Sequence, residues 1–231
     1  MLRATIVVFL LLFAQRLLAT ELNHSIASLE SAWAEVYYQK DEARQKQTYP
    51  VLLQRSSELV KRYPGAAEPK IWLATIMATN AAFESSFDAL ASLVKAKALL
   101  EEAIKINPQA LDGAAYVTLG TLYYMLPGWP VSFGDDEMAE QLLKASLSIN
   151  PQGIDANYFY ADFLLSKDRT AEAIVFFQRA SQAPLRQQQL FADTELQNEA
   201  RLGLVNAQHR KSNSDKNRFH SLFAAAAVKS E

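Results

Sequence analysis

The sequence predicts an all-α protein built from consecutive helix pairs, and three observations support this prediction. Half of the 231 residues are apolar, whereas only 7 are glycine and 8 are proline, a composition typical of a folded helical chain. From Ser25 to Arg210, apolar residues recur at spacings of three and four with almost no β-branched alternation. Prolines close successive helical patterns at intervals of 44, 43 and 33 residues, namely Pro64, Pro108, Pro151 and Pro184.

The first 19 residues are interpreted as a cleavable signal peptide. Arg3 supplies a positive charge, residues 4–14 form a largely apolar run, and Ala19 offers a small residue for cleavage. The run stops at residues 15–16, well short of the roughly 20 apolar residues that a membrane-spanning helix needs. We therefore expect cleavage after Ala19 and export of the chain, without a stable membrane span.

Cysteine content and charge narrow the expected location and partners. The chain has no cysteine, which excludes disulfides, thiolate metal sites and a lipid-anchor cysteine after the signal peptide. An exported chain without cysteine indicates the bacterial periplasm. Removal of residues 1–19 takes away Arg3 and Arg16 and leaves 21 of the 23 basic residues against 25 acidic ones, a net charge of −4. This balance gives no indication of nucleic-acid binding.

The first pair of helices is expected around Trp33–Tyr37 and Val51–Val60. This pair fits the repeat pattern poorly, as terminal repeats often do because they cap the stack. The next two repeats share a pattern of small and large residues before their prolines. These positions are Ala96, Leu100 and Ala103 in one repeat and Ala139, Leu143 and Ser146 in the other. The small residues sit where we expect helices to approach each other closely.

The first helix of the later of these two repeats carries Tyr116, Leu119, Gly120 and Tyr123 on one stripe, and this stripe resembles the first helix of a tetratricopeptide repeat. Both long repeats have extra residues between their paired helices, at about 80–92 and 126–135. The expected architecture is thus a tetratricopeptide-like helical-hairpin solenoid with elongated inter-helix inserts.

The last repeat is close to the usual repeat length of about 34 residues. Its first helix carries Asn157, Tyr160, Ala161 and Leu164, and its second carries Ala173, Phe177 and Ala180. A final helix over 192–210 is expected to cover the open end of the solenoid through Leu196, Ala200, Leu204 and Val205. The repeat domain then spans 20–210, and 211–231 is interpreted as a flexible tail.

Three segments carry a narrower resemblance. They are LGTLYYMLPG (Leu119–Gly128), FGDDEMAEQLL (Phe133–Leu143) and NYFYADFLL (Asn157–Leu165). Over roughly residues 68–184 the chain resembles the T-component family of tripartite ATP-independent periplasmic transporters. The resemblance implies a secreted helical repeat protein that forms ring-like trimers. It also implies work beside a periplasmic solute-binding protein and the passing of apolar ligands.

In repeats of this kind the first helix of each pair forms the concave wall, which predicts a groove for a partner or ligand. Its positions are Trp72, Ile76 and Thr79, then Val117, Thr121 and Tyr124, then Tyr158, Asp162 and Leu165. A strip with Trp72, Tyr124 and Tyr158 would suit an apolar ligand or a peptide, because aromatic rings bury a large area at a modest entropic cost. The alternative is that some of these rings pack against the insert or a neighbouring repeat.

The insert before the helix that starts near Asp135 is expected to be structural rather than a binding loop. Its prolines break the helix, and Trp129 and Phe133 are large and apolar enough that we expect them to fold back onto the protein. Asp135 or Asp136 is expected to accept hydrogen bonds from the free amides of the next helix. The consecutive acids 135–137 lack the spaced oxygen ligands of a metal loop.

No catalytic arrangement or cofactor motif is recognisable. The three histidines, His24, His209 and His220, lie near the ends of the mature chain, and the glycines are scattered rather than gathered in a phosphate loop. We therefore expect no enzyme activity, no cofactor and no metal. Two functions remain: an accessory component of periplasmic solute transport that acts beside a binding protein, or a general periplasmic adaptor that holds peptides or envelope proteins in its groove.

Overall fold

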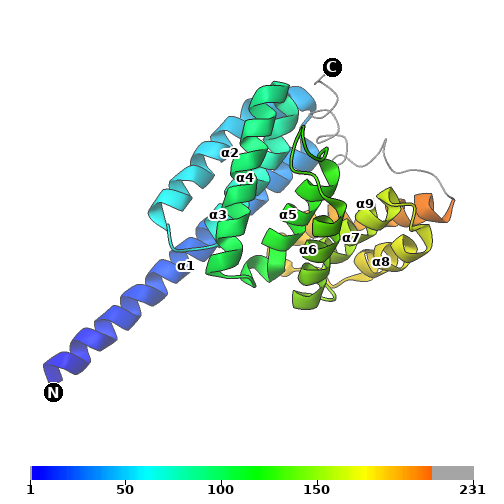
Figure 1. The fold of residues 1–231 in the computed structure, drawn as a ribbon. Helices are drawn as coiled ribbons and strands as arrows, with labels where there is room; N and C mark the ends of the chain where they lie inside the picture. The colour runs from blue at the N-terminus through cyan, green and yellow to red at the C-terminus, as the bar shows by residue number, and fades with distance from the viewer. Residues whose placement is uncertain (1, 210–231) are drawn as a thin grey trace.

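The computed structural model describes residues 2–209, with side-chain surroundings from residue 20 onward. This part of the chain is all-helical and contains no β-strand, which confirms the predicted fold class at that level (Figure 1). The helices are α1 (Leu2–Gln39), α2 (Glu42–Arg62), α3 (Glu68–Asn80), α4 (Ser86–Ile106), α5 (Ala114–Met125), α6 (Asp136–Ile149), α7 (Ile154–Ser166), α8 (Thr170–Gln182) and α9 (Leu190–Gln208). The segment interpreted as a tail, 211–231, lies outside the described residues.

Helix α1 is continuous over 38 residues and runs through the expected cleavage position at Ala19. Its N-terminal part projects away from the other helices, whereas its C-terminal part packs among them (Figure 1). There Ile26, Leu29 and Val36 are buried in one cluster with residues of α2 and α3. Among the residues that the structure describes, no helix has both the length and the apolar character needed to cross a membrane.

Consecutive helices pack side by side in the pairs α3–α4, α5–α6 and α7–α8. The small residues of α4 and α6, Ala96, Ala103, Ala139 and Ser146, are fully buried, as predicted. Gly120 shows why a small residue is needed, because a Cβ atom there would lie 2.9 Å from Cγ of Leu143. Helices α5 and α6 therefore approach each other closely at this glycine.

The two expected inserts differ in structure. Most of the residues at about 80–92 do not lie between the paired helices as expected, because a short 3-10 turn (Ala81–Phe83) leads directly to Ser85 and α4 begins at Ser86. The Ser85 hydroxyl accepts a hydrogen bond from the Asp88 amide at 3.3 Å and so begins α4 early. The extra residues lengthen a helix there, whereas 126–135 is irregular, as expected.

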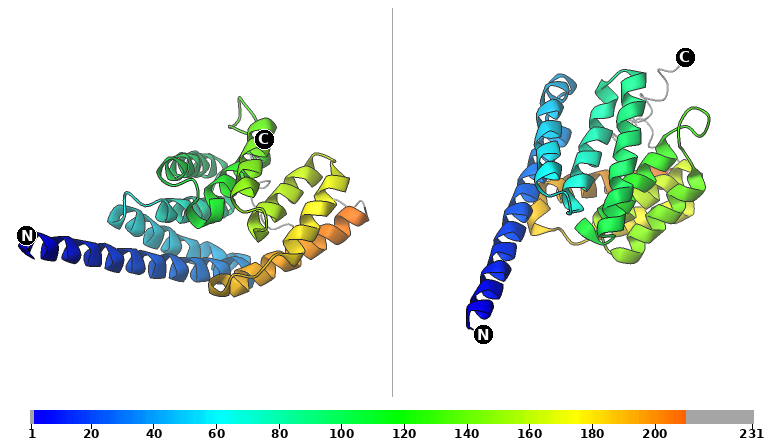
Figure 2. Two further views of the ribbon diagram at one scale, coloured as in Figure 1. Left: turned by 90° about the horizontal axis from the view of Figure 1, so that it is seen from below. Right: turned by 60° about the vertical axis from the view of Figure 1, so that its left-hand side comes forward.

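Helix α9 packs along α8, and its N-terminal part meets the C-terminal part of α1 (Figure 2). The rings of Tyr38 and Phe191 meet edge to face with centroids 6.0 Å apart. Leu196 and Ala200 are buried, as predicted, but Val205 is 49% exposed and that prediction is wrong. The buried face of α9 continues through Gly203 instead. Val205 is two residues further along the helix, which turns its side chain by about 200° to the outer face.

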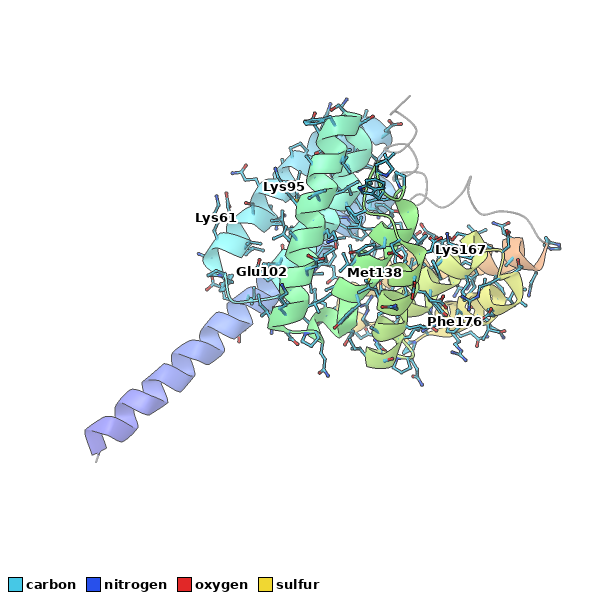
Figure 3. The ribbon with its side chains drawn as sticks, in the orientation of Figure 1. Lys61, Lys95, Glu102, Met138, Lys167 and Phe176 are labelled. Carbon is cyan, nitrogen blue, oxygen red and sulfur yellow. The ribbon has the colours of Figure 1, made fainter. Side chains whose placement is uncertain are left out.

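The second helices of the pairs present charged and polar side chains outward. Figure 3 shows Lys61 on α2 and Lys95 and Glu102 on α4 at the surface of the array, and all three are exposed. Lys105 on α4 is exposed as well, as expected for an outer position. The first helices, in contrast, face one another across the interior.

Candidate functional site

A cavity of about 120 Å³ lies where the first helices converge. Its wall is contributed by α1, α3, α5, α7 and α9, together with the segment that precedes α9. The apolar part of the wall includes Trp33, Tyr37, Trp72, Val117, Phe159 and Leu196. An engineered apolar cavity of about 150 Å³ in another protein takes up benzene, so this volume suits a small organic ligand.

Aromatic rings from α1 and α3 form one side of the cavity. The Trp33 ring stacks on Tyr37 with centroids 4.9 Å apart and lies 5.6 Å from the ring of Trp72. The Trp33 indole N–H donates a hydrogen bond to the Thr79 hydroxyl at 3.3 Å. The Trp72 indole N–H is also buried but has no acceptor among the described side chains and backbone, which is uncommon for a native tryptophan.

The other side of the cavity is charged. Arg186 binds Asp193 and Asp155 through its guanidinium, with N···O distances of 2.6 and 2.9 Å, and its backbone amide donates to Asp193 at 2.7 Å. Asp193 is almost completely buried. These bonds connect the segment before α9 to the start of α7 and to α9, and so hold this side of the cavity in place.

Glu30 on α1 faces the same cavity and is only 9% exposed. Burial raises the pKa of its carboxyl to about 7, although the positive charge of Arg186 and a hydrogen bond from Gln189 act in the opposite direction. The Gln189 Oε1 atom is buried and has no donor in the described part of the chain. The cavity thus contains a carboxyl that titrates near neutral pH beside an unsatisfied amide oxygen.

Three of the nine predicted groove residues, Trp72, Val117 and Thr121, line this cavity. Ile76 and Thr79 are fully buried within the helix packing instead. Their placement on the inner helices agrees with the prediction, but an open groove surface is not what surrounds them. These inner positions of α3 and α5 are instead buried between helices or line the cavity.

The expectation of an accessible aromatic strip at Tyr124 and Tyr158 is wrong, because these rings are only 9% and 2% exposed. Tyr124 donates its hydroxyl hydrogen to the Asp162 carboxylate at 2.6 Å, and burial raises the pKa of Tyr124 well above its usual value. Tyr158 packs edge to face on Phe177 at 5.8 Å. Leu165 is half-buried and packs against the same core cluster. Tyr124 thus packs against the next helix pair, in line with the alternative, whereas the contact of Tyr158 with Phe177 lies within its own pair, α7–α8.

The residues that sequence reasoning missed come mainly from the two ends of the array. Glu30 and Trp33 lie on α1, and Arg186 and Asp193 lie next to or on α9. Counting from repeat positions could not reach them, because neither terminal helix matches the repeat pattern. The aromatic group Trp33, Tyr37 and Tyr38 was the available signal on α1.

The insert caps α6, as expected for Asp135. Its carboxylate accepts hydrogen bonds from the amides of Glu137 and Met138 at 2.9 and 3.0 Å. Asp136 does not cap the helix and forms an ion pair with Lys167 at 2.6 Å. Asp135 thus joins the insert to the first turn of α6, and Asp136, the first residue of α6, joins that helix to Lys167 directly after α7.

Phe133 folds back as predicted, with its ring 5.4 Å from that of Tyr123. Trp129 does not, since it is 89% exposed, and the expectation for this residue is wrong. The two ends of the loop are joined by a hydrogen bond that the Gly134 amide donates to the Pro127 carbonyl at 2.9 Å. Trp129 lies between those points at the exposed tip, where the helices offer it no packing surface.

Comparisons with known proteins add no identification to this geometry. No family model matches the chain, and no curated protein matches it significantly. Among the described residues, no group of three or more histidine, cysteine, aspartate or glutamate side chains is arranged to hold a metal ion. The cavity between the first helices is therefore the candidate site on which a functional proposal can be based.

Proposed function

We propose that this chain is a non-enzymatic, exported helical repeat protein that binds a small, mainly apolar organic ligand and serves as an accessory component of periplasmic solute transport. The observation that carries the proposal is the aromatic cavity in which all the first helices meet. Ligand sites of small molecules are concave, mostly apolar and furnished with a few polar groups, and this cavity has each property.

The proposal includes a tetratricopeptide-like solenoid. Its support is the succession of the pairs α3–α4, α5–α6 and α7–α8, the close approach at Gly120, and the inward position of each first helix. Helix α2 and the described C-terminal part of α1 would form the atypical first repeat, and α9 would cover the last one. A repeat array of this kind supplies a concave wall without any catalytic group.

The transport role extends the resemblance to the T-component family, whose members act beside a solute-binding protein and form trimers. A cavity of about 120 Å³ supports the handling of a small ligand better than the capture of an extended peptide, and the start of α9 packs against α1 beside it. The adaptor function remains the second candidate. It is favoured by two exposed aromatic residues, Phe87 and Trp129, which are 83% and 89% accessible.

Intrinsic fluorescence offers a direct test of ligand binding. In a Trp129→Phe background, the remaining tryptophans are Trp33 and Trp72, and both line the cavity. Titration with toluene should give a saturable change in their emission. A Val117→Phe variant fills the cavity and should abolish that change, whereas the control Val94→Phe, at a half-exposed position on α4, should leave it intact.

Two results would contradict the proposal. One is the absence of saturable binding of toluene and of small polar organic ligands to the parent protein; the other is unchanged binding in the folded Val117→Phe variant. Light scattering after size-exclusion chromatography separates the two candidate functions. A trimer supports the transport role, and a monomer that captures extended peptides supports the adaptor.

A further inference from the structure

We infer that the ligand of this cavity is a small organic cation, with an ammonium group beside Glu30 and an apolar body against the aromatic side chains. The inference rests on the proposed function, since it requires that the cavity bind a ligand. Three independent features of the wall support it: the balance of charge, the cluster of aromatic side chains and the unsatisfied polar atoms.

The charged side chains of the wall are predominantly acidic. Glu30, Asp155, Asp193 and Glu199 supply four carboxyl groups, and Arg186 supplies the single guanidinium among the lining residues. Arg186 forms its ion pairs with Asp193 and Asp155, at 2.6 and 2.9 Å. Glu30 is left without a salt bridge among the described residues, so a cation entering the cavity would find its counter-charge there.

The same charges argue against an organic acid as the ligand. A carboxylate would enter a site with an excess of negative side chains. The guanidinium that could bind it already contacts two aspartates, one of which is almost completely buried. Displacing Asp193 would leave its buried charge unpaired, which is strongly unfavourable.

The aromatic side chains suit a cation in a second way. Trp33, Tyr37, Tyr38 and Trp72 form a continuous cluster, with Trp33 4.9 Å from Tyr37, 6.2 Å from Tyr38 and 5.6 Å from Trp72 between ring centroids. The face of an aromatic ring carries partial negative charge, and tryptophan faces attract cations most strongly. The apolar body of the ligand would pack on these same rings.

Two unsatisfied polar atoms complete the site. The buried Gln189 Oε1 needs a donor, and an ammonium group supplies up to three N–H donors. The Trp72 indole N–H, on a side chain that is 9% exposed, needs an acceptor. A cation whose body also carries a hydroxyl or ether oxygen would satisfy both atoms.

The ionisation of Glu30 gives the inference a pH signature. Three charged groups act on the Glu30 carboxyl: Arg186 in the segment before α9, Asp155 on α7 and Asp193 on α9. The uncharged Gln189 side chain also forms a hydrogen bond with it. Because burial raises the pKa of Glu30 to about 7, the carboxyl gains its negative charge as the pH rises through neutrality. Affinity for a cation should rise over the same interval.

The test uses isothermal titration calorimetry of the whole mature protein at about pH 8 with three probes of matched size: n-butylammonium, n-butanol and butanoate. We expect n-butylammonium to bind at least about tenfold more tightly than n-butanol, and butanoate to bind most weakly. Glu30→Gln should remove the preference for the amine and leave n-butanol affinity within about twofold. Glu35→Gln, the same change at an exposed position of α1, should alter neither affinity.

Two outcomes would overturn the inference but leave the proposed function intact: equal affinity for n-butanol and n-butylammonium, or tightest binding of butanoate. Failure of all three probes to bind would overturn both. A folded Glu30→Gln variant that kept the amine preference would also refute the inference. If that variant does not fold, the wild-type protein decides: n-butylammonium affinity must rise between about pH 5.5 and 8, where this amine stays protonated as a lysine side chain does, while n-butanol affinity stays constant.

Discussion

Replacing Glu30 with glutamine is expected to stabilise the protein at alkaline pH and to change its stability little in acid. The folded state holds the Glu30 proton more tightly than the unfolded chain does, because burial raises the carboxyl pKa from 4.5 to about 7. The favourable contribution of the protonated carboxyl is therefore complete below about pH 4.5 and is lost as the pH rises through 7. Glutamine has a similar shape and never acquires the charge.

The size of the effect follows from the two pKa values. At 1.36 kcal/mol per pKa unit, moving from 4.5 to about 7 corresponds to about 3 kcal/mol of unfolding free energy. The difference in stability between Glu30→Gln and wild type should thus grow from a small value near pH 4.5 to about 3 kcal/mol at pH 8. Taking the difference between the two proteins removes the contributions of the other titrating groups.

The measurement is urea unfolding followed by far-ultraviolet circular dichroism at several pH values across this interval. Glu35→Gln serves as the control, because Glu35 is an exposed residue of the same helix. A stability difference that does not vary with pH would refute the reasoning, and so would destabilisation by Glu30→Gln at pH 8. A variant that is more stable but no longer prefers an amine would show that the buried charge is retained for binding.

Three further changes test the packing. Tyr124→Phe removes a hydroxyl that bonds buried Asp162, and it should lower the unfolding free energy by about 1–2 kcal/mol in urea denaturation. Gly203→Ala would place a Cβ atom 2.6 Å from the ring of Phe177, so overpacking should cost about 1–3 kcal/mol and lower the melting temperature. Trp129→Ser, at the exposed loop tip, should shift stability by less than about 0.5 kcal/mol in the same melts.

The changes at Gly203 and Trp129 each have a matched comparison. Gly65→Ala is the control for Gly203, because a Cβ atom at Gly65 would meet nothing within 4 Å. Phe133→Ser is the comparison for Trp129, and it should destabilise clearly because the Phe133 ring packs on Tyr123. A stable Gly203→Ala protein would contradict the close approach of α8 and α9. A large effect of Trp129→Ser would mean that this ring is covered.

The sequence was sufficient to predict the helical class and much of the local packing. Helical periodicity marked the elements, and the small residues of α4 and α6 marked the places where helices meet. Asp135 was recognisable as a cap because an acidic side chain directly before an apolar helical pattern satisfies the free amides of the first turn. All these signals act between residues that are close in the chain.

The cavity was harder to predict because its polar side depends on contacts between distant segments. Nothing in the local pattern brings Glu30 toward Arg186, and the repeat register that placed Trp72 and Val117 correctly stops before both terminal helices. The same register counted Tyr124 as accessible, although its hydroxyl reaches Asp162 on α7 and the ring is covered. Neighbouring helices, rather than the helix itself, decide which inner positions remain open.

The meeting of α1 and α9 also bears on the order in which the molecule forms. Contacts within each helix pair join nearby residues and arise quickly, whereas Tyr38 and Phe191 are separated by about 150 residues of chain. The early helices, whose aromatic side chains face the interior, are synthesised long before α9, the helix that covers them. A nascent or truncated chain that ends before α9 would therefore hold most of its helix pairs while its inner aromatic residues stayed exposed to water, and the interior would become dry only when the final segment arrived.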